Sequence, residues 1–103
     1  MRGDVYELKA PRDARGHEQR GNRYAVVVQS DLLPLSTWLV APTSTSARPA
    51  SFRPEIEIEG KSTYVLAEQT AAIQPERLGR LVGHLSLQEM SAVDDALRTV
   101  LQL

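Results

Sequence analysis

Arginines and hydroxyl residues gather next to two apolar runs, and these side chains are the ones best suited to chemistry. Arg23, with Arg20 just upstream, comes directly before the run 24–28, and hydroxyl residues 43–46 follow the run 38–41. A guanidinium offers a planar fork of donors that fits phosphate oxygens, and hydroxyls can hold a phosphate by hydrogen bonds. If the two runs form neighbouring strands, these groups meet at one edge of a sheet, where they could stabilise charge on a phosphate under attack.

The sequence gives little support for thiol, metal or histidine chemistry. The chain has no cysteine, which excludes disulfides, zinc knuckles and thiol nucleophiles. The two histidines, His17 and His84, lie far apart in the sequence, so we expect no metal site and no other cofactor. His17 could act as a general acid or base, but an exposed loop position is the simpler interpretation.

Composition fits one small globular domain. The 103 residues carry 12 basic and 13 acidic side chains, and the net charge of −1 does not by itself indicate a nucleic-acid binder. Eight of the 12 basic residues lie before residue 54, so their distribution says more than their sum. No apolar run follows the first four residues, and none approaches the roughly 18–20 residues needed to cross a bilayer. We therefore expect a single cytoplasmic domain over residues 1–103, with no membrane contact.

Hydrophobic alternation predicts several short strands. The run 24–29 is apolar on both faces, which places it centrally in the sheet. In 55–59 glutamates alternate with isoleucines, which predicts a strand with a solvated acidic face. Long polar loops are expected over 10–22 and 42–51, with Pro42 ending the strand before the second loop. The expected strands cover residues 4–8, 24–29, 38–41, 52–58, 63–67 and 81–85.

One amphipathic helix is expected at the end of the chain. Ser86 and Glu89 have the spacing of a capping box, and apolar residues recur every three or four positions over 87–101. Proline at 75 favours a single helical turn over 75–78. Short strands followed by one terminal helix indicate a mainly β fold, a small and strongly bent barrel with the helix packed on it.

Several segments together resemble one known family. They are Arg-Gly-Asp-Val-Tyr at 2–6, Gly-His-Glu-Gln-Arg-Gly-Asn-Arg at 16–23, Arg-Tyr-Ala-Val-Val-Val at 23–28, Val-Ala-Pro-Thr-Ser at 40–44, Leu-Ala-Glu-Gln at 66–69 and the capped ending at 79–103. In order and spacing these segments resemble the MazF/PemK toxins over nearly the whole length of the chain.

The resemblance implies an SH3-like barrel of the CcdB/PemK (MazF) toxin type, acting as a homodimer in a type II toxin–antitoxin system. It further implies a metal-independent, sequence-specific endoribonuclease, or mRNA interferase. Such an enzyme cleaves single-stranded RNA, whether mRNA, tRNA or rRNA, and thereby inhibits translation. The 2′-hydroxyl of the RNA attacks, leaving a 2′,3′-cyclic phosphate and a 5′-hydroxyl. A cognate antitoxin would block the RNA groove with an extended acidic segment that folds on binding.

Site residues also follow from the resemblance. Arg23 would act on the scissile phosphate, as charge stabiliser or as proton donor to the leaving oxygen. Thr43 would hold that phosphate in place, with Thr45 as the alternative if the strand ends two residues later. The residues expected to contact RNA are His17, Glu18, Gln19, Arg20, Ser44, Thr45 and Arg48.

Tyr24 departs from the family pattern. It stands where the family has proline, so the backbone beside Arg23 lacks the angle that a proline ring would fix. Two alternatives stay open: a CcdB-like toxin that acts on gyrase by protein contact through its C-terminal helix, and a degenerate toxin that only binds its antitoxin.

Overall fold

A computed structural model describes residues 1–9 and 23–103 of the chain. These residues form a mainly β structure with one terminal α-helix, which confirms the expected fold class. The strands are β1 (Asp4–Leu8), β2 (Tyr24–Val27), β3 (Trp38–Ser44), β4 (Glu55–Ile58), β5 (Lys61–Val65), β6 (Ala71–Ile73) and β7 (Leu78–His84). The helices are the 3₁₀ turns η2 (Ala67–Gln69) and η3 (Pro75–Arg77) and the helix α1 (Leu87–Leu101).

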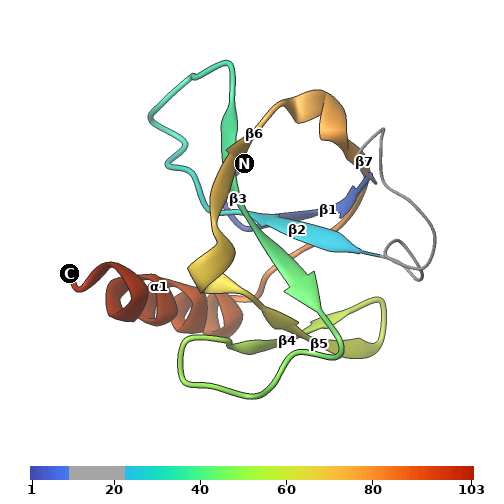
Figure 1. Ribbon diagram of the computed structural model, residues 1–103. Helices are drawn as coiled ribbons and strands as arrows, with labels where there is room; N and C mark the ends of the chain where they lie inside the picture. The colour runs from blue at the N-terminus through green and yellow to red at the C-terminus, as the bar shows by residue number, and fades with distance from the viewer. Residues whose placement is uncertain (10–22) are drawn as a thin grey trace.

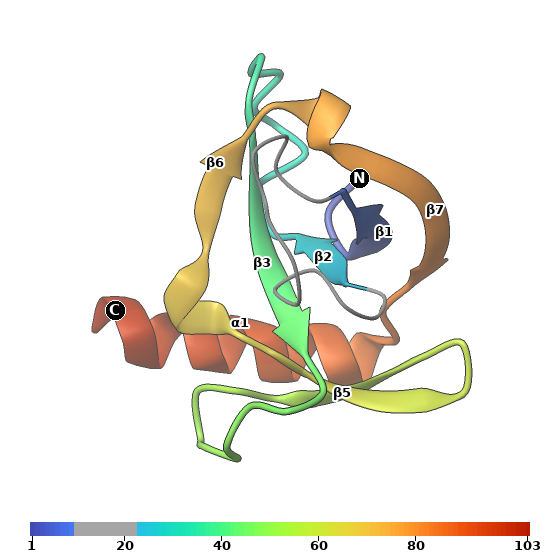
Figure 2. The same cartoon turned by 45° about the vertical axis from the view of Figure 1, so that its right-hand side comes forward.

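The strands pair antiparallel in the order β4-β5-β3-β2-β1-β7, and β6 pairs with β3. Strand β3 is shared between two parts of the sheet, because residues 38–40 pair with β6, residues 40–42 with β2 and residues 43–44 with β5. This sharing bends the sheet into a half-barrel. Figure 2 shows β6, β3, β2, β1 and β7 following one another around an arc, with α1 and the β4–β5 hairpin below it.

Strand β2 separates two hydrophobic cores. Val26 and Val28 join the larger core, which also contains Val93 of α1, whereas Ala25 and Val27 join a smaller core with Leu78 at the start of β7. Successive side chains of a strand point to opposite faces, so a strand buried on both faces must be apolar throughout. The central place predicted for this run is therefore correct.

Helix α1 closes the larger core on the side of the half-barrel seen at the bottom of Figure 1. The predicted capping box is present: Glu89 N donates to Ser86 Oγ at 3.1 Å and Ser86 N donates to Glu89 Oε1 at 2.9 Å. Arg2 Nη2 donates to Asp94 Oδ1 at 2.7 Å, which ties the start of the chain to the helix. The buried Val93 and the half-buried Met90 and Leu97 provide the apolar contacts.

Some expected boundaries are wrong. Pro42 lies inside β3, which continues to Ser44; its carbonyl accepts a hydrogen bond from Leu66 N at 2.8 Å, and its missing N–H is tolerated where no ladder bond needs it. Strand β6 is not in the expected set, because two alanines and one isoleucine give a weak strand signal. The turn between β4 and β5 falls at Glu59 and Gly60, with φ of 51° and 82°.

Boundaries elsewhere shift by a few residues. Strand β4 begins at Glu55, three residues later than expected, and β7 begins at Leu78, three residues earlier. The expected helical turn after Pro75 is confirmed as η3. The acidic face of the hairpin is also confirmed, because Glu55, Glu57 and Glu59 are all exposed.

Candidate functional site

A pocket of about 210 Å³ lies where the end of β1, the start of β2 and the middle of β3 meet the segment from η2 to η3. Its wall is apolar, and its rim carries three cations and one amide. The lining residues are Leu8, Lys9, Arg23, Val40, Pro42, Gln69, Ala71, Ile73 and Arg77. A cationic rim over an apolar wall suits a ligand that joins an anionic group to a flat apolar one.

Backbone hydrogen bonds hold the three cationic residues together. Leu8 N donates to the Arg23 carbonyl at 2.9 Å, and Lys9 N donates to the Arg77 carbonyl at 2.8 Å. Arg77 Nη2 donates in return to the Lys9 carbonyl at 3.3 Å. The end of β1 therefore joins Arg23 on one side to Arg77 on the other, which fixes their separation within the fold.

Arg77 has unused hydrogen-bonding capacity. Its Nε is buried, and within residues 1–9 and 23–103 it has no hydrogen-bond acceptor. Phosphate oxygens are the acceptors that arginine binds best. The three cations on its rim therefore favour an anionic group in this pocket.

Thr43 faces away from this pocket. Its side chain is 3% exposed, and its Oγ1 donates to the Tyr24 carbonyl at 3.3 Å. Pairing of Ala25 with Pro42 puts Pro42 on the face of the sheet that bears the pocket, and alternation puts Thr43 on the opposite face. The structure brings Arg23 and Thr43 onto neighbouring strands, but it does not bring the Thr43 hydroxyl to the pocket.

Ser44 lies on the same face of β3 as Pro42, which is the face that bears Arg23 and the pocket. Successive side chains of a strand alternate between faces, so Ser44 points opposite to Thr43. It is half-buried, and its Oγ accepts from Ser46 N at 3.2 Å. Thr45 and Arg48 lie in the exposed loop that follows β3. The remaining expected RNA contacts lie outside the residues that the structure describes: His17, Glu18, Gln19 and Arg20.

Lys9, Gln69 and Arg77 belong to the pocket but were not among the residues expected from the sequence. Gln69 ends the Leu-Ala-Glu-Gln segment, which carried part of the family resemblance and could have identified it. Lys9 and Arg77 are brought together by the pairing of β1 with β7, which joins residues far apart in the sequence. Neither has a local signal that distinguishes it from a solvated cation.

An ion pair fixes the turn that carries Gln69. Arg53 Nε and Nη2 both donate to Glu68 Oε2, at 3.0 and 2.6 Å, and the two side chains are about three-quarters buried. The hydrogen bond from Arg53 is the main reason that the pKa of Glu68 lies below its usual value. Because Glu68 and Gln69 are adjacent in η2, this pair holds the pocket's amide in place.

Two features of the described part of the chain concern metal binding and the spanning of a membrane by a helix. No group of three or more histidine, aspartate or glutamate side chains is placed there to bind a metal ion. None of its helices is long and apolar enough to cross a membrane.

The fold and the pocket define a small half-barrel protein with a cationic pocket at one edge. Residues 1–101 match the family of PemK-like, MazF-like toxins of type II toxin–antitoxin systems. The chain belongs to this family.

Curated relatives agree with this assignment over the full length. A candidate toxin of Mycobacterium tuberculosis strain H37Rv is 43% identical over 104 residues, covering 100% of this chain and 98% of the relative. Endoribonuclease EndoA of Bacillus subtilis strain 168 is 32% identical over 110 residues, covering 99% and 94%.

Solved structures share the fold. An endoribonuclease from a mycobacterial species, in complex with its cognate antitoxin, superposes with a TM-score of 0.80 at 19% identity, covering 100% of this chain and 95% of that one. MazF from Deinococcus radiodurans gives a TM-score of 0.77 at 21% identity, covering 99% and 96%. The half-barrel with one terminal helix is therefore the architecture of MazF structures.

Proposed function

We propose that this protein is the toxin of a type II toxin–antitoxin pair and acts as a metal-independent, sequence-specific endoribonuclease on single-stranded RNA. The observation that carries the proposal is the pocket in which Arg23, Lys9 and Arg77 surround an apolar wall. Family membership supports it, as does the full-length similarity to endoribonuclease EndoA. Cleavage of cellular RNA would inhibit translation and growth.

The reaction needs no nucleophile from the protein. The 2′-oxygen of the RNA attacks the neighbouring phosphorus and loses its proton, the bond from phosphorus to the 5′-oxygen breaks, and that oxygen takes up a proton. The products are a 2′,3′-cyclic phosphate and a 5′-hydroxyl. Negative charge grows on the phosphate during attack, and Arg23 stabilises it from the rim of the pocket. Lys9 and Arg77 hold the flanking phosphates.

Hydroxyl groups divide into two roles in this proposal. Thr43, expected from the sequence to hold the phosphate, has its hydroxyl on the Tyr24 carbonyl, so it acts by fixing the start of β2. Ser44 and Thr45 supply the hydroxyls at the RNA surface, together with Arg48. Gln69, exposed beside the pocket, has the amide needed to read the edge of a base.

Two protein partners complete the proposal. Solved relatives include an endoribonuclease bound to its cognate antitoxin and MazE–MazF complexes. We infer that a cognate antitoxin covers the pocket of this protein with an extended acidic segment. We also infer that the protein is a homodimer, which light scattering on the purified chain tests directly.

Cleavage of a long single-stranded RNA in excess EDTA, with mapping of the 5′ ends, tests the activity. We expect discrete cuts with free 5′-hydroxyls, which disappear in Arg23→Ala. Arg98→Ala is the matched control, because Arg98 is an exposed arginine on α1 that bonds to Asp95. Lys9→Ala and Arg77→Ala should each lower the slope of log affinity against log salt by about 0.7, the value for one lost phosphate contact on a single strand.

Three results would each overturn the proposal. RNA that stays intact while gyrase-dependent DNA breaks appear indicates a CcdB-like toxin. Intact RNA with tight antitoxin binding indicates a degenerate toxin. Cuts that are the same in Arg23→Ala and in the wild type would show that the pocket is not the active site.

A further inference from the structure

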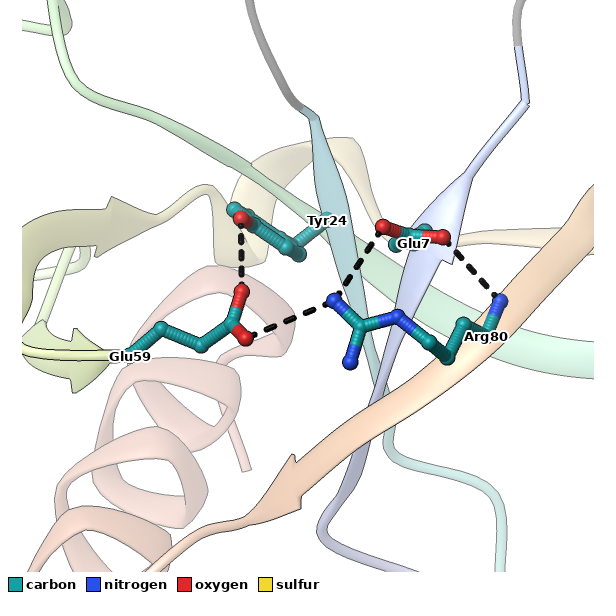
Figure 3. Close-up of polar contacts among 4 residues, drawn as sticks. All are labelled: Glu7, Tyr24, Glu59 and Arg80. Atoms are coloured by element: carbon teal, nitrogen blue, oxygen red, sulfur yellow. Dashed lines mark hydrogen bonds and ion pairs between the residues drawn. The ribbon is translucent and has the colours of Figure 1, made fainter.

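Four polar side chains from four separate parts of the chain form a continuous array beside the start of β2. Tyr24 Oη donates to Glu59 Oε1 at 3.3 Å, and Arg80 Nη2 donates to Glu59 Oε2 at 3.4 Å. Arg80 also meets Glu7, through Nη2 at 3.5 Å and through its backbone N at 3.3 Å. Figure 3 shows the Arg80 guanidinium linked to both carboxylates, and Glu59 linked in turn to Tyr24. The array links the tip of the β4–β5 hairpin to β1, β2 and β7.

Close packing helps to hold this array together. A Cβ on Gly79, the residue before Arg80, would lie 3.3 Å from Cβ and Oε1 of Glu7. The glycine therefore leaves room for the Glu7 side chain to lie against β7. The hydrogen bond to Glu59 is the main reason that the pKa of Arg80 is raised.

Tyr24 is anchored at both ends. Its ring packs against the larger core, its hydroxyl meets Glu59, and its carbonyl accepts the hydrogen bond from Thr43. Arg23 precedes it directly, on the opposite face of the strand, where it lines the pocket. Rotation of the backbone between these two residues would move the Arg23 guanidinium, and it would also pull the Tyr24 ring and hydroxyl from their contacts.

We propose that Tyr24 is a positioning residue for Arg23, and that Glu59, held in turn by Arg80, fixes it through the tyrosine hydroxyl. This inference rests on the proposed function, because it assigns Tyr24 a part in aiming the guanidinium at the phosphate. Proline at this position would fix the backbone angle φ through its ring. In this protein the contacts of the Tyr24 side chain restrict the backbone instead.

Exposure decides what kind of effect to expect. The side chains of Arg80, Glu59 and Glu7 are 59%, 44% and 40% exposed, and exposed ion pairs contribute little to stability. Loss of the array should therefore leave the fold intact. The rate of cleavage should be more sensitive than stability, because a displacement of about 1 Å in a catalytic group can lower a rate by about a hundredfold.

A double-mutant cycle tests the inference. Tyr24→Phe removes only the hydroxyl, and Glu59→Ala removes its acceptor. We expect each change to lower the kcat of RNA cleavage about five- to tenfold, less than a full misplacement would, with KM and Tm nearly unchanged. The double variant should lose little more than either single one, because each single change already removes the Tyr24–Glu59 hydrogen bond. Glu57→Ala is the matched control, an exposed glutamate on the same hairpin, and should leave kcat unchanged.

A second measurement does not need activity. The Nε–Hε resonance of Arg23, assigned with Arg23→Lys, should shift or broaden in Tyr24→Phe and Glu59→Ala, while that of Arg98 stays in place. If wild-type cleavage depends on Arg23 but both variants keep full kcat and an unmoved Arg23 resonance, the inference is wrong and the proposed function stands. Losses that multiply in the double variant also overturn it. If the wild type does not cleave RNA, the proposed function fails, and the resonance alone decides whether Tyr24 orders Arg23.

Discussion

Replacing Thr43 by valine removes one buried hydroxyl and keeps the shape of the side chain. The hydroxyl donates to the Tyr24 carbonyl at 3.3 Å, which is longer than usual for a hydrogen bond between two oxygens. A neutral hydrogen bond of this kind contributes about 0.5–1.5 kcal/mol to folding, and the added methyl group offsets part of the loss. We expect Thr43→Val to destabilise the protein by about 1 kcal/mol, which lowers the Tm by about 4–8 °C in a chain of this size.

Activity separates this role from direct contact with RNA. Well below the Tm, kcat in Thr43→Val should fall by no more than about threefold, whereas loss of a donor that stabilises the transition state lowers kcat by about 10²–10³. Thermal unfolding and cleavage of a short single-stranded substrate measure the two quantities on one sample. An unchanged Tm combined with a hundredfold loss of kcat would refute the reasoning and place the Thr43 hydroxyl on the phosphate.

Ser44→Ala is the natural comparison, because Ser44 is the next residue and lies on the other face of β3. Its half-buried hydroxyl accepts a single backbone hydrogen bond, from Ser46, so the Tm should change little. If Ser44 contacts RNA, cleavage should fall while stability holds, which is the reverse of the result expected for Thr43→Val.

Two further predictions concern stability. The pKa of Glu68 is lowered in the folded state, so its pairing with Arg53 stabilises the fold above pH of about 4.5 and is lost as the pH falls below that value. Glu68→Gln should therefore lower the free energy of unfolding at pH 7 by about 1–2 kcal/mol and flatten its decline in acid, as urea titrations at several pH values would measure. Ser86→Ala breaks the capping box and should lower the free energy of unfolding by about 1 kcal/mol, with Ser86→Asp as the variant that retains it.

The sequence predicted correctly those elements that are determined by a few neighbouring residues. The run 24–27 is buried on both faces and is a central strand, and the Ser86–Glu89 cap begins the one α-helix. Each of these signals lies within a few residues and needs no knowledge of the rest of the fold. Arg23 could be placed beside a sheet edge for the same reason, since it directly precedes the strongest strand.

The features that the sequence did not predict depend on which face of a strand each residue occupies, and on pairing between strands far apart in the sequence. Pro42 was expected to end its strand, but β3 continues. One residue of difference decides whether Thr43 or Ser44 lies on the face of the sheet that bears the pocket. Lys9 and Arg77 meet only because β1 pairs with β7. Strand β6 is formed by pairing with β3, since its own residues favour no strand strongly. Thus the sequence pattern indicated the region of the candidate site, and strand pairing was needed to bring its cations Lys9 and Arg77 together.

The two cores on either side of β2 restrict how this region can evolve. Deleting or inserting one residue in 24–27 would exchange the side chains that the two cores receive, and it would also carry Arg23 to the opposite face. Substitutions that keep the alternation of shapes are compatible with both cores, whereas changes in length are not. Insertions and deletions among descendants of this gene should therefore be absent from this strand. They should be tolerated in the loop that follows β3, because neither core depends on side-chain alternation there.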